Sequence, residues 1–293
     1  MRRRAFGDTG LDVSAVGFGA GHIGEPAYDD GLAGRLLHAA LDAGVTFVDT
    51  ARGYGLSEER IGRHLRGRRS EVVLSTKVGY DVPGAEDWTA AAVSGGVDRA
   101  LAALRTDVID VVFLHSCPRA VLERGEVVAA LRGARDAGKL RVAGYSGEND
   151  ALSWAVDSGA FGAVQTSVNL ADQWSLHHAL SRAAAAGLGV VAKRPLANAP
   201  WRFADRPVGR YAELYWERLR TMGLEPADGD WLSTALRFAA YAPGVSTAIV
   251  GTGSVAHLDD AVAAGERGPL PPGEFARWRE AFGPHADDWP GDT

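Results

Sequence analysis

Cysteine, long apolar runs and blocks of like charge are all scarce in this chain of 293 residues. With a single cysteine, Cys117, no disulfide can form within the chain, and a reducing, cytoplasmic setting is expected. No apolar run reaches the roughly 20 residues that a membrane-spanning helix needs, so no membrane partner is expected. The net charge of −6 comes without a long run of one sign, which argues against a nucleic-acid partner. The basic start, MRRR, has no apolar segment behind it and is not typical of a secretory signal.

Short β-branched segments alternate with longer amphipathic segments along the whole chain. In the stretch DGLAGRLLHAALDAG, for example, Leu32, Leu36, Leu37 and Ala40 fall on one face of a helix. Eight strands that alternate with helices over about 250 residues predict an α/β fold of the (β/α)8 type, a TIM barrel. The predicted strands are 15–19, 45–49, 72–77, 109–115, 141–146, 163–166, 189–193 and 246–250.

We expect residues 1–293 to form a single barrel domain, because no linker or low-complexity segment interrupts this pattern. Ahead of the first strand, RRRAFGDTGLDVS predicts a β-hairpin that turns at residues 8–10 and caps the bottom of the barrel. The longest irregular part is expected at about 197–230, which is rich in Trp, Arg and Pro. A loop of that length inside a compact domain usually carries function or disorder.

The stretch AVGFGAGHIG contains Gly19, Gly21 and Gly24, in the G-x-G-x-x-G spacing of Rossmann dinucleotide sites. Asp49 ends the next predicted strand, where such a site has its ribose-binding acid. A Rossmann helix, however, starts inside the glycine loop, whereas here EPAYDD intervenes and the helix is predicted to begin near Asp29. The alternative, a tight loop at the end of a strand, is therefore favoured.

Four chemically different side chains fall at or just beyond the ends of three neighbouring predicted strands: Asp49, Tyr54, Lys77 and His115. The carboxyl ends of the strands share one face of a barrel, and that face carries active sites. Each residue alone has an ordinary explanation. Asp49 could cap a helix and Tyr54 could be a packing residue, while Lys77 could be a solvated rim residue and His115 a structural hydrogen bonder. Their convergence on one small region favours a catalytic site.

This set of side chains suits the reduction of a carbonyl group. Hydride that arrives at the carbonyl carbon leaves negative charge on the oxygen, which then needs a proton donor. An ammonium beside a phenol favours the phenolate, so Lys77 can activate Tyr54 as general acid in reduction and as base in oxidation. Asp49 can hold Lys77 charged and oriented, and His115 can donate a hydrogen bond to the carbonyl oxygen.

The stretches FVDTARGYGLSEERIGRHL, VVLSTKVG and VVFLHS resemble the aldo-keto reductase superfamily, and the similarity runs from LDVSAVGFG to VSTAIVGTGSVAHLDDAV. The resemblance implies a (β/α)8 barrel that uses NAD(P)H, with Asp49, Tyr54, Lys77 and His115 as the catalytic tetrad. It also implies an extended cofactor across the carboxyl-end face of the barrel instead of a Rossmann domain, with the glycine loop near the nicotinamide.

The resemblance also implies which residues contact the cofactor. Ser146 and Gln165 match residues that hold the carboxamide, whereas Gly147 stands where relatives have Asn. Lys193 stands where a Tyr commonly stacks on the nicotinamide, and Arg194 could reach the pyrophosphate. The full set of expected cofactor-binding residues is Gly19, Ala20, Ser146, Gln165, Lys193, Arg194, Leu196, Gly251, Thr252, Ser254 and His257.

The segment GTGSVAHLDD is the adenosine-phosphate site that the resemblance implies, and backbone amides at a helix start near Ser254 can bind phosphate there. The resemblance favours NADP(H) over NAD(H). The segment nevertheless contains no Lys or Arg, and a 2′-phosphate is best held by the fixed donors of an arginine. His257 is the only side chain in it that can become cationic, so we expect the preference for NADPH to be modest.

The favoured function is therefore NAD(P)H-dependent reduction of an aldehyde or ketone, a small-molecule carbonyl substrate, by an enzyme of the aldo-keto reductase type. Two alternatives stay open: a non-catalytic NADP(H)-binding barrel that acts as a redox sensor or regulator, and an unrelated barrel lyase or aldolase with Lys77 as Schiff-base nucleophile. No metal site is expected, because His115 and Cys117 are too few ligands for zinc. The sequence predicts neither the particular substrate nor the oligomeric state.

Overall fold

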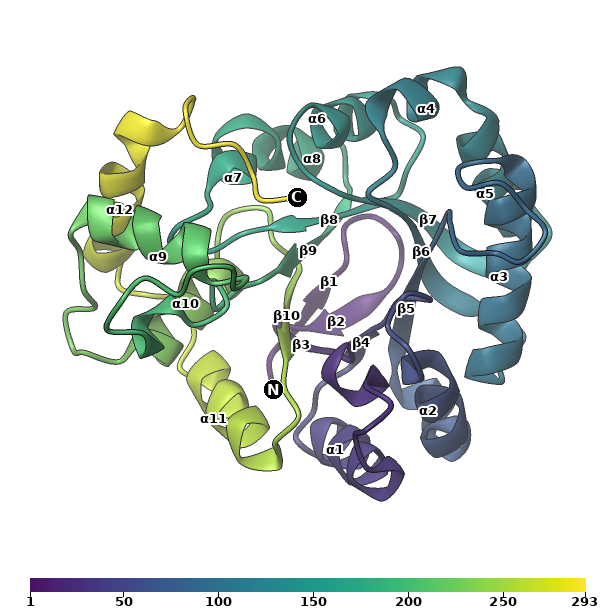
Figure 1. The fold of residues 1–293 in the computed structure, drawn as a ribbon, viewed down its shortest axis with the longest axis horizontal. Helices are drawn as coiled ribbons and strands as arrows, with labels where there is room; N and C mark the ends of the chain where they lie inside the picture. The colour runs from purple at the N-terminus through teal and green to yellow at the C-terminus, as the bar shows by residue number, and fades with distance from the viewer.

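The computed structural model describes residues 1–293 and contains a closed barrel of eight parallel strands (Figure 1). The strands follow chain order around the barrel, and the last one closes it by pairing with the first. The predicted α/β fold of the (β/α)8 type is confirmed, and each predicted strand is present to within two residues at either end. The strands are β3 (Val16–Gly19), β4 (Phe47–Asp49), β5 (Val73–Val78), β6 (Ile109–His115), β7 (Leu140–Ser146), β8 (Ala163–Ser167), β9 (Gly189–Lys193) and β10 (Thr247–Gly251).

The predicted hairpin is present as β1 (Arg3–Ala5) and β2 (Asp12–Ser14), which pair in antiparallel fashion. Phe6, Leu11 and Val13 are buried in one cluster with the apolar side chains that fill the inside of the barrel. At Gly7, φ is +56°, and a Cβ would lie 2.3 Å from a backbone carbonyl oxygen ahead of β9, so only glycine fits. The hairpin therefore plugs the amino end of the barrel and leaves the carboxyl end for the site.

Helices surround the barrel and bury their apolar faces on the outside of the strands, in a cluster of 54 buried residues (Figure 1). As predicted, α1 is capped by Asp29, whose side chain accepts a hydrogen bond of 2.7 Å from the amide of Leu32. No helix combines the length and the apolar character that crossing a membrane requires. The helices are α1 (Asp30–Asp42), α2 (Ser57–His64), α3 (Ala90–Leu104), α4 (Arg119–Arg124), α5 (Glu126–Asp136), α6 (Asn149–Asp157), α7 (Trp174–His178), α8 (Leu180–Ala185), α9 (Glu213–Met222), α10 (Trp231–Ala240), α11 (Val255–Glu266) and α12 (Pro272–Phe282), with 3-10 turns η1 (His22–Gly24), η2 (Arg66–Glu71), η3 (Pro200–Arg202) and η4 (Gly283–His285).

The segment 197–230 is not irregular throughout, and that prediction is wrong for the ten residues of α9. Tyr215 and Leu219, four residues apart, pack together with Trp278 of α12 in a separate apolar cluster. The helix ends at Gly223, where φ is +62°. The abundant Trp and Arg of this segment thus belong partly to a helix that packs beside the barrel mouth. Figure 1 shows the C-terminal segment, in yellow, turning back from α12 to end inside the ring of helices.

Candidate active site

Strand alternation aims the chemically active side chains into the carboxyl-end mouth of the barrel. Phe47, Val73 and Phe113 belong to the cluster that fills the barrel interior. Successive side chains of a strand point to opposite faces, so residues two or four positions further on also point inward, one or two layers higher. The strand residues of the predicted tetrad occupy those positions: Asp49, Lys77 and His115.

Asp49 and Lys77 form an ion pair that is almost completely buried, with 2.6 Å between Oδ2 and Nζ. Asp49 Oδ1 also accepts hydrogen bonds from Ser75 Oγ at 2.7 Å and from Gln165 Nε2 at 2.9 Å. The ammonium donates a second bond to the carbonyl of Thr50 at 2.8 Å. Burial opposes the charge of Lys77, but Asp49 and the Tyr54 phenol outweigh it and raise the pKa of Lys77. The lysine is therefore held as a fixed cation.

Tyr54 lies beside this cation, with its ring centroid 4.9 Å from Lys77 Nζ. Its ring is edge-on to the imidazole of His115, at 6.1 Å between centroids. The third glycine of the G-x-G-x-x-G stretch explains how this loop is placed, because a Cβ at Gly24 would lie 1.8 Å from the carbonyl oxygen of Tyr54. Gly24 thus serves close packing on the tyrosine loop, and the Rossmann interpretation is wrong, because the strand before the glycines belongs to a closed barrel.

The block that follows Tyr54 locks the two loops together. On α2, Ser57 Oγ donates to the carbonyl of Ala20 at 2.9 Å, and Arg60 donates to the carbonyl of Ile23 at 2.6 Å. Glu58 accepts a hydrogen bond of 2.6 Å from the hydroxyl of Thr76 on β5, and burial raises the pKa of the Glu58 carboxyl. These buried polar side chains explain why the motif SEER is specific: each one satisfies a backbone or side-chain group of a neighbouring loop or strand.

His115, at the end of β6, is flanked by cations. Burial, together with the positive charges of Lys77 and Lys193, lowers the pKa of His115 to about 3. The imidazole is therefore neutral at physiological pH. Its Nδ1 lies 2.7 Å from the hydroxyl of Tyr80, in the loop after β5.

The two predicted carboxamide-binding residues, Ser146 and Gln165, are connected to Asp49 of the tetrad through the side chain of Gln165. Ser146 Oγ donates to Gln165 Oε1 at 3.1 Å, and the amide of Gln165 reaches Asp49. A Cβ at Gly147 would lie 2.2 Å from the hydroxyl of Tyr145, so a side chain such as the asparagine that the resemblance implies there would force the buried Tyr145 to move. The amide of Gln165 and the hydroxyl of Ser146 are thus the polar groups that this wall of the mouth offers.

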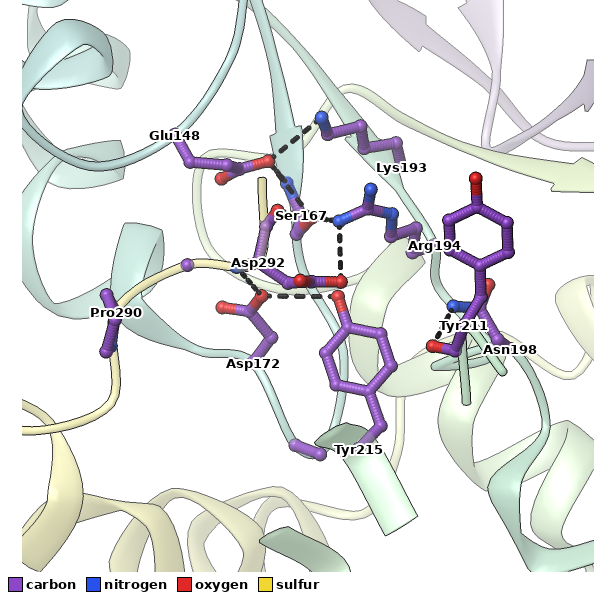
Figure 2. Close-up of polar contacts among 12 residues, drawn as sticks. Glu148, Ser167, Asp172, Lys193, Arg194, Asn198, Tyr211, Tyr215, Pro290 and Asp292 are labelled. Carbon is purple, nitrogen blue, oxygen red and sulfur yellow. Dashed lines mark hydrogen bonds and ion pairs between the residues drawn. The ribbon is translucent and has the colours of Figure 1, made fainter. Parts of the chain in front are cut away.

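Lys193 is paired with Glu148, which the sequence did not reveal (Figure 2). The ammonium lies 3.1 Å from Glu148 Oε1, and the same oxygen accepts hydrogen bonds from the amide and the hydroxyl of Ser167, at 2.9 and 3.0 Å. Val191, two residues before Lys193, belongs to the interior cluster, so Lys193 also points into the barrel mouth. The mouth is therefore lined by two ion pairs, Asp49–Lys77 and Glu148–Lys193.

Arg194 contacts the C-terminal segment, as Figure 2 shows. Its guanidinium donates to the backbone carbonyl of Asp292 at 2.6 Å and lies 3.0 Å from the Asp292 carboxylate. A Cβ at Gly291 would lie 3.1 Å from Glu148, so the segment packs directly on the second ion pair. Arg194 itself has φ of +54°, and Ala197, Asn198 and Ala199 after it also have positive φ. A run of left-handed non-glycine residues is costly and is typical of functional loops.

Asp172 connects this segment to α9. Its Oδ2 accepts hydrogen bonds from the amide of Asp292 at 3.0 Å and from the hydroxyl of Tyr215 at 3.3 Å (Figure 2). Complete burial, with the nearby Glu148 carboxylate, raises the pKa of Asp172 to about 7. The amide of Asp292 and the charges of Arg194 and Arg218 only partly offset this rise.

We expect Asp172→Asn to flatten the pH dependence of stability. The folded chain binds a proton at Asp172 up to about pH 7, whereas an unfolded aspartate releases it near pH 4, so this proton stabilises the fold in acid. That contribution is lost as the pH rises toward and through 7, with a slope of at most about 1.4 kcal/mol per pH unit. Denaturant unfolding at pH 5 and pH 8 measures it. Equal pH dependence in the parent and the asparagine variant would contradict the assignment.

The remaining predicted cofactor residues lie at the β3 and β10 ends. Gly19 pairs with Gly251 across the two strands, and the amide of Ala20 donates to the carbonyl of Asp49 at 2.8 Å. The turn after β10 leads into α11, of 12 residues, whose N-cap is Ser254. Thr252 is buried and bonds within this turn, His257 is exposed on the first turn of α11, and Leu196 packs against the apolar clusters.

This donor set fits an extended anionic cofactor. Ser146 and Gln165 supply groups that suit a carboxamide, and the helix start at Ser254 supplies backbone amides for a phosphate. Lys193 and Arg194 are cations at the same mouth, each of them paired with a carboxylate of this chain. Gly251 keeps the backbone of the turn open, since a Cβ there would come within 3.2 Å of His22.

Comparison with known proteins agrees with this geometry. The sequence pattern of the Aldo/keto reductase family matches residues 15–282. The chain belongs to the aldo/keto reductase family. As a member of that family it is an oxidoreductase that uses a nicotinamide cofactor and acts on a small carbonyl substrate.

Individual family members resemble the chain over most or about half of its length. L-galactose dehydrogenase of Arabidopsis thaliana is 28% identical over 285 residues, which are 89% of this chain and 87% of that protein. The 6-dehydroglucose reductase of Novosphingobium aromaticivorans is 34% identical over 49% of this chain and 50% of its own length. Among solved structures, the holo form of the aldo-keto reductase AKR11C1 from Bacillus halodurans has a TM-score of 0.84, at 26% identity and 96% coverage of each chain.

Proposed function

We propose that this chain, acting as one (β/α)8 domain over residues 1–293, reduces an aldehyde or ketone to an alcohol with NAD(P)H, and that Tyr54 is the proton donor. One observation carries the proposal: Lys77 is a buried, charged lysine fixed by Asp49 at 2.6 Å and placed 4.9 Å from the centre of the Tyr54 ring. A fixed ammonium next to a phenol favours the phenolate, which is the form that remains after Tyr54 has given up its proton.

Each residue has a separate task in this proposal. When bound, the nicotinamide cofactor supplies the hydride, and Ser146, Gln165 and the helix start at Ser254 are the residues that would hold it. His115, which is neutral, donates a hydrogen bond that orients the carbonyl oxygen and stabilises the charge that develops there. Tyr54 then transfers its proton to that oxygen, and Lys77 stabilises the phenolate until a proton returns.

The geometry of Lys77 argues against the lyase alternative. A Schiff-base lysine must be an uncharged and accessible amine, whereas Lys77 is 2% exposed, and its ammonium bonds to Asp49 and to the carbonyl of Thr50. Borohydride treatment in the presence of a carbonyl substrate is therefore expected to trap no adduct on Lys77.

The direct test is to titrate the chain with NADPH and NADH by nicotinamide fluorescence and then to add carbonyl compounds. The panel includes aldoses and their dehydro derivatives, because two relatives are named for sugar substrates. Carbonyl-dependent oxidation of the cofactor is the expected result. Tight binding without turnover on the whole panel would favour the redox-sensor alternative, and absence of binding would overturn the proposal.

We expect the preference for NADPH over NADH to be modest and to grow as the pH falls toward 6. The turn from Gly251 to the start of α11 contains no Lys or Arg, so His257, on the first turn of α11, is the only side chain there that protonation can make cationic. Dissociation constants of both cofactors at pH 6 and pH 8 test this, in the parent, in His257→Ala and in the control His177→Ala on α7. A large preference that is independent of pH and survives His257→Ala would point to an arginine from another loop.

A further inference from the structure

A second tyrosine, Tyr80, touches the proposed active site without belonging to the tetrad. Its hydroxyl lies 2.7 Å from Nδ1 of His115, and the two rings are stacked with their centroids 5.4 Å apart and their planes 28° apart. No other hydrogen-bond partner for this hydroxyl is present in the protein. The second ring nitrogen of His115, Nε2, makes no hydrogen bond within the protein and is not sealed from solvent.

The loop after β5 holds Tyr80 firmly in this position. The ring of Trp88 packs on Gly79 so closely that a Cβ there would lie 2.1 Å from it, and the Trp88 amide bonds to the Gly79 carbonyl at 2.7 Å. Tyr80 meets Trp88 edge-on at 5.7 Å between centroids. On the other side, Arg52 donates to the carbonyl of Asp81 at 2.9 Å and ties this loop to the loop that carries Tyr54. These four contacts fix the position of the phenol in the site.

Given their protonation states, only one arrangement lets the Tyr80 hydroxyl donate to His115 and also leaves the imidazole with a proton to donate to a carbonyl oxygen. The low pKa of His115 keeps its imidazole neutral, so only one of its two nitrogens carries a proton. Burial raises the pKa of Tyr80, so its hydroxyl stays protonated and must donate. If Nδ1 carried the imidazole proton, the hydroxyl would find no acceptor in the protein, and Nε2 could not donate to a carbonyl oxygen. The hydrogen bond that one nitrogen makes fixes the state of the other.

We propose that Tyr80 is a positioning residue for His115: its hydroxyl donates to Nδ1 and so holds the histidine in the tautomer that carries its proton on Nε2, ready to donate to the carbonyl oxygen. This inference rests on the proposed carbonyl reduction. It assigns to the loop after β5 a part in catalysis that acts through His115 and does not require contact with substrate.

The test combines kinetics with a spectroscopic readout of the tautomer. In the parent, long-range ¹H–¹⁵N correlation of the imidazole, assigned with His115→Gln, is expected to show an unprotonated, hydrogen-bonded Nδ1 and a protonated Nε2. In Tyr80→Phe, the Nδ1 signal is expected to move toward that of a free unprotonated nitrogen or of a tautomer mixture. In Tyr80→Phe, fewer molecules carry the proton on His115 Nε2 that donates to the carbonyl oxygen, so kcat is expected to fall by about 10- to 100-fold. The affinity for the cofactor is expected to stay within about twofold of the parent.

The control variant is Tyr241→Phe, which removes another partly buried hydroxyl with a 2.7 Å hydrogen bond, here to the Gly265 carbonyl, and is expected to change neither readout. A protonated Nδ1 in the parent protein overturns the proposal by itself. The proposal can therefore be tested even if the Tyr80 variant fails to fold. A loss of activity in Tyr80→Phe with unchanged imidazole signals would also overturn it. Failure of carbonyl reduction in the parent refutes the proposed function instead, and the tautomer measurement tells the two failures apart.

Discussion

Tyr54→Phe is expected to lower carbonyl reduction by about 10²- to 10⁴-fold while leaving cofactor binding nearly intact. General acid–base groups typically contribute this much, and the substitution removes only the proton donor from a ring that stays beside Lys77. Single-turnover reduction of a test aldehyde by bound NADPH gives the rate, and fluorescence titration gives the dissociation constant.

The control for this experiment is again Tyr241→Phe, whose hydroxyl bonds to Gly265 outside the mouth. A phenylalanine variant that reduces the aldehyde at close to the parent rate would show that Tyr54 is not the acid. If cofactor affinity instead fell in parallel with the rate, Tyr54 would act in binding, and the assignment of the proton step would fail.

Lys77→Met is expected to be at least as damaging to reduction, and it also destabilises the fold. Without the ammonium the Tyr54 phenolate loses its stabilising charge, so any remaining alcohol oxidation shifts to higher pH. The Asp49 carboxylate is left buried with only Ser75 and Gln165 as partners. Removing one member of a buried ion pair costs about 3–5 kcal/mol. The pH profile and denaturant unfolding measure the two effects.

The double variant Asp49→Asn with Lys77→Met separates these effects. It removes the uncompensated charge, so it is expected to regain much of the lost stability without regaining activity. An unchanged pH profile in the single variant would mean that Lys77 is not coupled to Tyr54. Recovery of activity in the double variant would mean that the lysine serves the fold alone.

The barrel and the place of the tetrad were predictable because both depend on local patterns. Alternation along a strand fixes which side chains point inward, and strand ends in a parallel barrel share one face, so Asp49, Lys77 and His115 had to converge. The block after Tyr54 was recognisable only through its resemblance to the aldo-keto reductase family, whereas the burial of Ser57, Glu58 and Arg60 became visible in the structure.

The partners of Lys193 and Arg194 were not predictable from spacing. Glu148 lies 45 positions from Lys193, and Asp292 lies 98 positions from Arg194, so only the closed barrel and the returning C-terminal segment bring them together. The family resemblance implied that Lys193 and Arg194 contact the cofactor. It did not indicate that the carboxylates of Glu148 and Asp292 are their partners in the folded chain. Helix α9 was missed for a related reason: its apolar face packs on α12, which comes much later in the chain.

Closure of the barrel between β3 and β10 has a consequence for synthesis and folding. β3 spans Val16–Gly19, and its partner β10 spans Thr247–Gly251. During translation, more than two hundred residues are therefore added after β3 before the strand that pairs with one of its edges has been made. Contacts so distant in sequence form slowly, and an open strand edge can pair wrongly in the meantime. The edge of β3 is only four residues long and includes Gly17 and Gly19, which makes it a poor template for aggregation. Gly19 also pairs with Asp49, so the strand whose second partner is made last also lies directly beside the strand that carries the predicted tetrad aspartate.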